Sequence, residues 1–334
     1  MWKSLKDRAE GVKEMKRMKT TEAVGQVLCH DITQIIPGVT KDAVFRKGHI
    51  IREEDIPVLL SVGKDSVYIW ENDETMMHEN DAAEVLYRMT ANEHMHPSDV
   101  KEGKIEVIAD TEGLLKVDRE KLKKVNAFGE MMIATRHGNT VVKKGDKLAG
   151  TRIIPLVIKK DKMQEAEKIC DGTPILKILP FTVKKAAIIT TGNEVYHGRI
   201  KDAFTPVIEQ KIAEFGAEMM FHEIFDDNDR KITDGCLRAI EAGADIVFCT
   251  GGMSVDPDDK TPLAIKNTGA EMISYGSPVL PGAMFLLSYY RKGDKVIPIC
   301  GLPGCAMYNR RTIFDLVLPR LMAADPVTAD ELAS

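Results

Sequence analysis

The chain has 334 residues, of which 44% are hydrophobic and 29% are charged, a composition typical of a soluble globular protein with room for two domains. Its formal net charge of −5 argues against a dedicated nucleic-acid-binding protein, since such proteins carry a basic face. No apolar run approaches the roughly 18–20 residues that span a bilayer, and the N-terminus lacks an apolar signal core, so we expect a cytoplasmic protein without membrane partners.

The first part of the chain is predicted to be a charged arm followed by a β-rich domain. Residues 1–19 alternate in charge, so a solvated arm is expected, with a frayed charged helix as the alternative. Residues 20–181 contain short apolar runs broken by glycine and proline turns, which indicates a β-rich α+β domain. Its predicted helices lie at 53–60 and 76–91, and its predicted strands at 104–109, 113–117, 140–142 and 152–158.

Residues 182–334 are predicted to form an α/β domain, because apolar strand-like runs alternate with segments of helical spacing. Such an alternation produces a mostly parallel sheet with helices on both faces. Ligands of such a sheet are expected beyond the carboxyl ends of its strands. The predicted strands lie at 185–191, 218–225 and 245–249, and the predicted helices at 204–215 and 232–240.

The end of this domain is expected to depart from the simple alternation. A short helix should begin at Pro262, with Thr261 as its N-cap. Two apolar runs at 284–290 and 295–300, joined by a polar turn, indicate a hairpin at a sheet edge. The closing helix is expected to carry one apolar stripe, made of Met307, Phe314, Leu318 and Leu321.

Four glycine-containing loops follow strand-like runs in this domain. Glycines at a strand end let backbone N–H groups approach a bulky anion, because no Cβ stands in the way. A single such loop is also explained as a plain turn, but four that meet at one edge favour a phosphate-binding site. Asn193 and Glu194 follow the first loop, where they can bind a heterocycle or a phosphate, and the hydroxyl of Ser254 lies in the second. The other predicted ligand-binding residues are Thr191 and Gly192; Thr250, Gly251 and Gly252; Pro281 and Gly282; and Gly301, Leu302, Pro303 and Gly304.

Two acidic clusters accompany these loops. Asp256, Asp258 and Asp259 follow the second loop, and three carboxylates in four residues repel one another unless a positive charge counters them. A hard cation would suit them, although one carboxylate is enough to cap the following helix. Asp226 and Asp227 follow another strand, where helix capping is the favoured role and metal binding the second.

At these loops the chain resembles the molybdopterin-binding domain family, and most of all the molybdopterin molybdenumtransferase group (MoeA and the E domain of gephyrin). The family's Ser/Thr-Thr-Gly-Asp/Asn-Glu strand end is matched at 190–194. Its Thr-Gly-Gly-x-Ser-x-Gly-x-x-Asp loop is matched at 250–259, with Asp256 in place of the last glycine. Its Pro-Gly-x-Pro loop is partly matched at 281–284, and its Gly-Leu-Pro-Gly-Asn-Pro loop reads Gly-Leu-Pro-Gly-Cys-Ala at 301–306.

The resemblance implies a three-layer α/β/α domain that binds molybdopterin and its terminal phosphate. It also implies insertion of molybdate into the pterin dithiolene of adenylylated molybdopterin, with AMP leaving and Mg²⁺ assisting. On this basis Asp259 matches the family's catalytic aspartate with Asp258 beside it, and Asp226, Asp227 and Asp259 would hold the metal. A homodimer formed through the first domain is expected, with molybdoenzymes or other cofactor-assembly proteins as further partners.

The sequence departs from the transferases at three points. Their Asp-Ser-Asn triplet reads Asp-Ala-Phe at 202–204, Pro262 stands where they have a lysine, and we expect no C-terminal β domain after Leu321. A non-catalytic carrier or sensor of the finished cofactor therefore stays open. The Asp-Asp-Lys-Thr segment at 258–261 also resembles competence-damage-type nucleotide pyrophosphatases, which share this domain.

Overall fold

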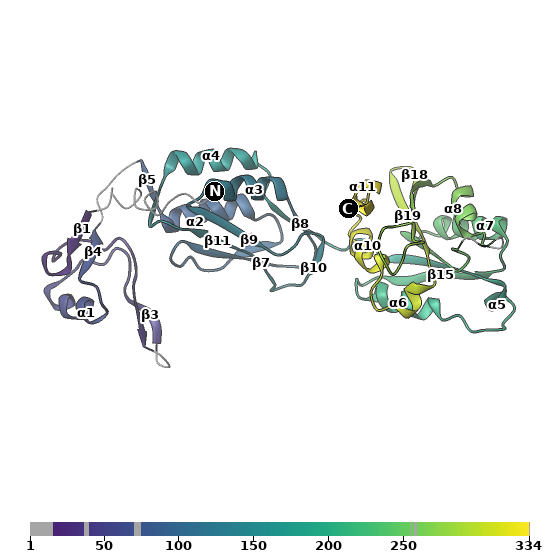
Figure 1. The fold of residues 1–334 in the computed structure, drawn as a ribbon, viewed down its shortest axis with the longest axis horizontal. Helices are drawn as coiled ribbons and strands as arrows, with labels where there is room; N and C mark the ends of the chain where they lie inside the picture. Colours follow the sequence, from purple (N-terminus) through teal and green to yellow (C-terminus); the bar gives the residue numbers. More distant parts are fainter. Residues whose placement is uncertain (1–15, 37–39, 70–74, 255, 257–258, 334) are drawn as a thin grey trace. The chain divides into compact units, whose positions relative to one another are not determined.

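The computed structural model describes residues 16–36, 40–69, 75–254, 256 and 259–333 (Figure 1). The chain divides into two compact units. The first comprises residues 1–111, 115–138 and 142–178, and the second residues 112–114, 139–141 and 179–334. Most of the expected N-terminal arm, residues 1–15, lies outside the described residues, and its end forms the strand β1 (Lys16–Lys19).

The first unit begins with two antiparallel ribbons and a small hydrophobic cluster. β1 pairs with β4, and β2 pairs with β3. The buried members of this cluster that the structure describes lie between Ala23 and Ile69. The predicted helix at 53–60 is present as a 3-10 turn that continues into α1. The elements after β1 are η2 (Thr20–Glu22), β2 (Ile32–Ile36), β3 (Thr40–Phe45), η3 (Glu53–Asp55), α1 (Ile56–Ser61) and β4 (Ser66–Ile69).

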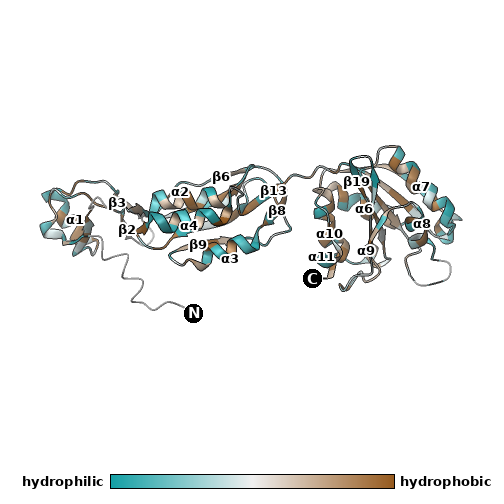
Figure 2. Cartoon of the chain, turned by 90° about the horizontal axis from the view of Figure 1, so that it is seen from above, coloured by the Kyte–Doolittle hydropathy of each residue, from teal (hydrophilic) through white to brown (hydrophobic). Residues whose placement is uncertain are grey.

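The rest of the first unit is a four-stranded antiparallel sheet, in the order β6-β7-β11-β9, packed against helices. Two smaller sheets are a pair in the order β12-β5 and a three-stranded sheet in the order β10-β8-β13. In Figure 2 the helices α2, α3 and α4 each carry hydrophilic and hydrophobic stretches, as expected where one face packs on a sheet. The elements are β5 (Met76–His78), α2 (Glu79–Thr90), β6 (Met95–Pro97), β7 (Lys104–Ala109), β8 (Gly113–Val117), α3 (Arg119–Ala127), β9 (Met131–Thr135), β10 (Thr140–Val142), β11 (Lys147–Ile153), β12 (Val157–Lys159), α4 (Lys160–Cys170) and β13 (Leu176–Leu179).

Two predictions for this unit need correction. The helix predicted at 76–91 begins only at Glu79, because Met76–His78 pair with β12 as a strand. The single strand predicted at 152–158 is two strands, since β11 ends at Ile153 and pairs with β7 and β9, whereas β12 pairs with β5.

The second unit is built on a six-stranded sheet in the order β15-β14-β16-β19-β18-β17 (Figure 1). The pairs among β15, β14, β16 and β19 are parallel, and β18 and β17 continue the sheet antiparallel. The elements are β14 (Lys185–Thr191), α5 (Asn193–Tyr196), α6 (Phe204–Ala213), β15 (Glu218–Phe225), α7 (Asp229–Glu241), β16 (Ile246–Thr250), α8 (Thr261–Asn267), β17 (Glu271–Tyr275), β18 (Leu286–Lys292), β19 (Lys295–Leu302), α9 (Cys305–Tyr308), α10 (Ile313–Met322) and α11 (Ala329–Ala333).

Successive side chains of β14 point to opposite faces of the sheet, and helices cover both faces, so this unit has three layers. Ala186 and Ile188 pack into a cluster with α6 and α10, whereas Ala187 and Ile189 pack into a cluster with α7 and α8. This period of two, with both faces apolar, is why the strand is a continuous hydrophobic run. The predicted three-layer α/β/α fold with a mostly parallel sheet is therefore confirmed.

The last part of the second unit differs from the predictions in three respects. The hairpin is present, but it does not form the sheet edge, because β19 pairs with β16 and β17 lies outside β18. Thr261 is the first residue of α8 and not its N-cap, which is Lys260. The closing helix is divided, with Met307 in the one-turn helix α9 and the rest of the predicted stripe in α10.

Candidate functional site

The carboxyl ends of four strands lie at one edge of the six-stranded sheet. β14, β15, β16 and β19 run in the same direction, so the loops that follow them leave the sheet together. β18 is antiparallel, with Leu286 opposite Gly301, so the loop that carries Pro281 and Gly282 enters the sheet from this same edge. The four glycine loops predicted from the sequence thus lie at a single edge of the sheet, which we call the loop edge.

Two buried threonines hold the Gly251–Gly252 turn. Thr261 Oγ1 donates to Gly251 O at 2.8 Å and lies 3.0 Å from Thr191 Oγ1, which donates to Thr250 O at 3.1 Å. Gly251 has φ +87°, and a Cβ there would lie 2.2 Å from Thr191 O, so only glycine fits. The Thr191 hydroxyl is engaged within the protein, and the half-buried backbone of the two glycines is the part that can meet a ligand.

The fourth loop lies directly against this turn. A Cβ at Gly301 would lie 2.5 Å from Met253 Cε, so the methionine side chain covers this glycine. Gly301, Leu302 and Pro303 are buried and Gly304 is exposed. The helix that follows is a single turn, so its dipole is short, and the anion attraction expected from a helix N-terminus behind this loop is small.

The third loop serves the docking of α10. Gly282 has φ +125°, and a Cβ there would lie 2.5 Å from Ile313 Cγ2. Ile313 N donates to Pro281 O at 3.3 Å. Ser254 is placed differently, because its side chain is exposed and its neighbour Met253 accepts a hydrogen bond from the Tyr275 hydroxyl at 3.1 Å. Of these residues, Ser254 is the one whose side chain is open to a ligand.

The first loop and the first acidic pair are connected. Asn193 N donates to Asp227 Oδ2 at 3.1 Å, and Glu194 beside it is exposed. Asp226 Oδ2 accepts from Lys231 Nζ at 2.8 Å. Its second oxygen, Oδ1, is buried and has no hydrogen-bond partner among the described residues. A buried carboxylate oxygen without a partner is costly, so a donor or a cation would stabilise it.

The second acidic cluster is partly described. Asp259 Oδ2 accepts a hydrogen bond from Asp256 N at 3.3 Å, and Asp258 lies outside the described residues. Burial and the nearby Asp259 carboxylate raise the pKa of Tyr275. In the part of the chain that the structure describes, no three His, Cys, Asp or Glu side chains are grouped to hold a metal ion. A cation at Asp226 or Asp259 would therefore need oxygens from a bound ligand or water.

A polar cluster that no sequence motif indicated lies next to the first loop. Asp202 Oδ2 accepts from Thr190 Oγ1 at 2.9 Å and from Thr205 Oγ1 at 2.6 Å, and His222 Nε2 lies 3.5 Å from the same oxygen. Burial acts to raise the pKa of Asp202, but these hydroxyl and backbone hydrogen bonds hold it below its usual value. The cluster joins residues from β14, α6 and β15, and no short-range motif reveals such a grouping.

Comparisons with known proteins bear on both units. Residues 187–323 match a family model described as "Probable molybdopterin binding domain", and residues 17–71 match a "Domain of unknown function (DUF8806)". The first match supports the resemblance to molybdopterin-binding domains that the loops indicated, and it does not single out the transferase group.

Among curated relatives, a putative competence-damage inducible protein of Bacillus cereus (strain B4264) is 30% identical over 129 residues, which cover 39% of this chain and 30% of that protein. A protein with the same description from Bacillus subtilis (strain 168) is 32% identical over 85 residues, which cover 25% of this chain and 20% of that protein. The chain therefore spans less than a third of the length of these relatives.

Among solved structures, the tungsten cofactor synthesizing protein MoaB from Pyrococcus furiosus is similar to 43% of this chain and 95% of that chain, with 19% identity and a TM-score of 0.36. A molybdenum cofactor biosynthesis protein from Pyrococcus furiosus is similar to 93% of this chain and 63% of that chain, with 12% identity and a TM-score of 0.26.

Over the described residues, no helix combines the length and the apolar character that crossing a membrane requires.

Proposed function

We propose that the second unit binds a phosphorylated pterin of molybdenum-cofactor assembly at the loop edge, and that it inserts molybdate into the dithiolene of adenylylated molybdopterin. The observation that carries this proposal is the family match over residues 187–323, which includes the Gly251–Gly252 turn. The backbone of the two glycines is half-buried, so it can be reached by a phosphate at the loop edge.

In this proposal the chain's own residues bind and orient the substrate. The Gly251 and Gly252 backbone and the Ser254 hydroxyl hold the phosphate, and Asn193 and Glu194 contact the heterocycle from the neighbouring loop. Asp259, held by the Asp256 amide, organises the molybdate. Mg²⁺, when bound, would neutralise phosphate charge, and Asp226 Oδ1, which has no hydrogen-bond partner among the described residues, would be one of its ligands.

The test is AMP release from adenylylated molybdopterin with molybdate and Mg²⁺. Asp259→Ala is expected to lower the rate about 100-fold or more, because an organising charge is lost. Asp294→Ala, in the exposed turn between β18 and β19, is the matched control and should retain the wild-type rate. No release from the wild-type protein, while a known transferase works in the same assay, would refute catalysis.

Two alternative functions are each supported by a separate observation. A cofactor carrier is favoured by the Asp-Ala-Phe sequence at 202–204, and it predicts pterin binding that survives Asp259→Ala without turnover. A nucleotide pyrophosphatase is favoured by the 30% identity to a competence-damage inducible protein over 129 residues. It predicts hydrolysis of ADP-ribose with a divalent metal, and a protein inert toward a panel of nucleotides would exclude it.

A further inference from the structure

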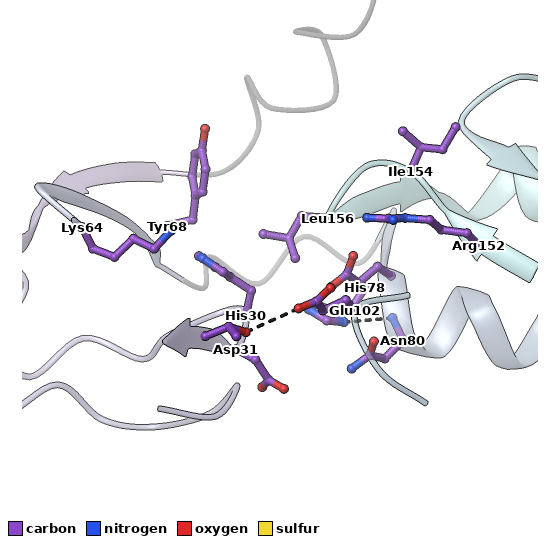
Figure 3. Close-up of a pocket in the computed structure, with 12 residues that line it drawn as sticks. His30, Asp31, Lys64, Tyr68, His78, Asn80, Glu102, Arg152, Ile154 and Leu156 are labelled. Atoms are coloured by element: carbon purple, nitrogen blue, oxygen red, sulfur yellow. Dashed lines mark hydrogen bonds between the residues drawn. The ribbon is translucent and has the colours of Figure 1, made fainter. Parts of the chain in front are cut away.

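The first unit contains a cavity of about 500 Å³ that the proposed function does not use (Figure 3). Its lining comes from the start of β2, from β4 and the turn before it, and from the end of β5 with the first turn of α2. The turn before β7 and the end of β11 with the residues after it complete the lining. Figure 3 shows Arg152 extending toward the centre from one side, with His30 and Asp31 on the other.

A buried histidine fixes the wall of this cavity. His78 is 2% exposed; its Nε2 lies 2.6 Å from Cys29 O, and its Nδ1 accepts from Asn80 N at 3.1 Å. Because Nδ1 accepts, the proton is on Nε2 and is donated to the Cys29 carbonyl. Burial lowers the pKa of His78, so the ring is neutral near pH 7. The histidine thus joins the strand pair around β4 to the first turn of α2.

A tight turn places two carboxylates next to each other. Gly103 N donates to Asn80 Oδ1 at 2.9 Å, and a Cβ at Gly103 would lie 3.1 Å from Glu79 Cβ. Glu102, which precedes this glycine, has φ +51° and accepts from Thr33 Oγ1 at 3.4 Å. The turn therefore holds the Glu102 carboxylate near Glu79, at the start of α2.

Five charged side chains line the cavity without direct ion pairs among them. They are Asp31, Lys64, Glu79, Glu102 and Arg152, and within the described parts of the chain no two of them form an ion pair. Burial raises the pKa of Glu79 to about 7, and Glu102 and Asp31 add to the rise against the opposing effects of Arg152 and Lys47. Three carboxylates against two cations leave the lining with one more acidic group than basic groups.

The chemistry of the lining favours an organic ligand with N–H groups over a bare cation. Among the described residues, no three potential ligands are grouped to hold a metal ion. A carboxylate makes its strongest paired contact with two parallel N–H donors. Arg152, Asn80 and Thr33 offer donors and acceptors for the remainder of a ligand, and Tyr68, Ile154 and Leu156 offer apolar surface.

We propose that this cavity binds a small molecule with an amidine-like edge, in which one carbon bears two N–H donors, and that Glu79 receives this edge. Alkyl guanidines and 2-amino-4-oxo heterocycles share this chemistry. The proposal does not depend on any reaction at the loop edge of the second unit.

Isothermal titration of the full chain with two probe pairs tests the proposal and distinguishes the sources. Agmatine is compared with putrescine, which lacks the amidine edge, and guanosine with inosine, which lacks the 2-amino group. At least one complete probe is expected to bind with a dissociation constant below about 1 mM, and at least about ten-fold more tightly than its partner. Which of the two binds identifies the source.

The role of Glu79 is tested with Glu79→Gln, and Glu84→Gln on the exposed side of α2 is its control. Glu79→Gln should weaken binding about ten-fold or more and Glu84→Gln should not change it. If Glu79→Gln fails to fold, Glu102→Gln provides the same comparison. Wild-type affinity should rise between pH 6 and 8 as Glu79 ionises, and this rise should disappear in Glu79→Gln. Absence of binding by both complete probes, or binding that Glu79→Gln and Glu102→Gln leave unchanged, overturns the proposal.

Discussion

At the scale of single residues, the loop edge depends on a glycine that has no substitute. Gly251 and Gly269 have nearly the same φ, +87° and +85°, so an alanine would meet similar backbone strain at both positions. They differ in their surroundings: a Cβ at Gly251 would lie 2.2 Å from Thr191 O, whereas a Cβ at Gly269 would have nothing within 4 Å. A comparison of alanine substitutions at Gly251 and Gly269 therefore distinguishes the cost of backbone strain from the cost of a clash with Thr191 O.

We expect Gly269→Ala to cost about 1 kcal/mol, the usual strain of an alanine at positive φ, and Gly251→Ala to cost about 3 kcal/mol or more. The extra cost arises because the end of β14 must move away from the turn. Hydrogen exchange of the β14 and β16 amides measures both values in the intact protein. Equal costs at the two positions would show that the turn adapts without moving β14.

Side-chain roles at the loop edge could be predicted from the sequence only in part. The glycine positions follow from the need for positive φ, which sequence patterns report well. The internal use of the Thr191 hydroxyl could not be predicted, because its partner Thr261 lies 70 residues away. The same holds for the cavity of the first unit, whose charged lining is drawn from positions as distant as Asp31 and Arg152.

At the scale of secondary structure elements, strands that form long apolar runs between turns were predicted with accurate bounds. The strands at 185–191 and 218–225 are observed with the same bounds, although β14 is buried and β15 is an edge strand whose side chains are exposed or half-buried. β17, the shorter strand at the other edge of the sheet, was missed. The start of α2 was misplaced because pairing of Met76–His78 with β12 is a tertiary effect.

The Asp245 carboxylate connects the starts of the parallel strands β14, β16 and β19, at the edge of the sheet opposite the loop edge. Asp245 precedes β16, and its Oδ2 accepts from Lys184 N at 3.1 Å and Lys185 N at 3.0 Å at the start of β14. Its Oδ1 accepts from Lys295 Nζ at 2.5 Å at the start of β19. Burial acts to raise the pKa of Asp245, but these hydrogen bonds hold it below its usual value.

Asp245→Asn is expected to destabilise the second unit by about 2 kcal/mol at pH 7, since hydrogen bonds to a charged group are lost or weakened. A depressed folded-state pKa stabilises the protein above the unfolded-state value, and this contribution is lost as pH falls through the folded-state pKa. The difference between wild type and variant should therefore be constant above about pH 5 and shrink below about pH 4. Hydrogen exchange of the β16 amides measures this difference in stability. A difference that is the same above about pH 5 and below about pH 4 would contradict a stabilising role of the ionised Asp245 carboxylate.

At the scale of the whole molecule, the buried residues of each hydrophobic core come from one part of the chain, as far as the structure describes it. Among the described residues, the buried members of the two clusters that sandwich the six-stranded sheet lie between Val183 and Leu332. The buried members described for the main cluster of the first unit lie between Ala82 and Ile178. Since burial of apolar surface is the dominant favourable term in folding, each of these segments holds most of what it needs to fold.

A fragment of residues 179–334 is therefore expected to fold by itself. The expected result is a cooperative urea transition by far-ultraviolet circular dichroism, and β14 and β16 amides protected from exchange as in the full chain. The control fragment, residues 218–334, lacks β14, which lies between β15 and β16, so its sheet is interrupted and it should be unfolded. If 179–334 were unfolded while the full chain protects these same strands, the second unit would depend on the first for its stability, and the proposed division into independent domains would fail.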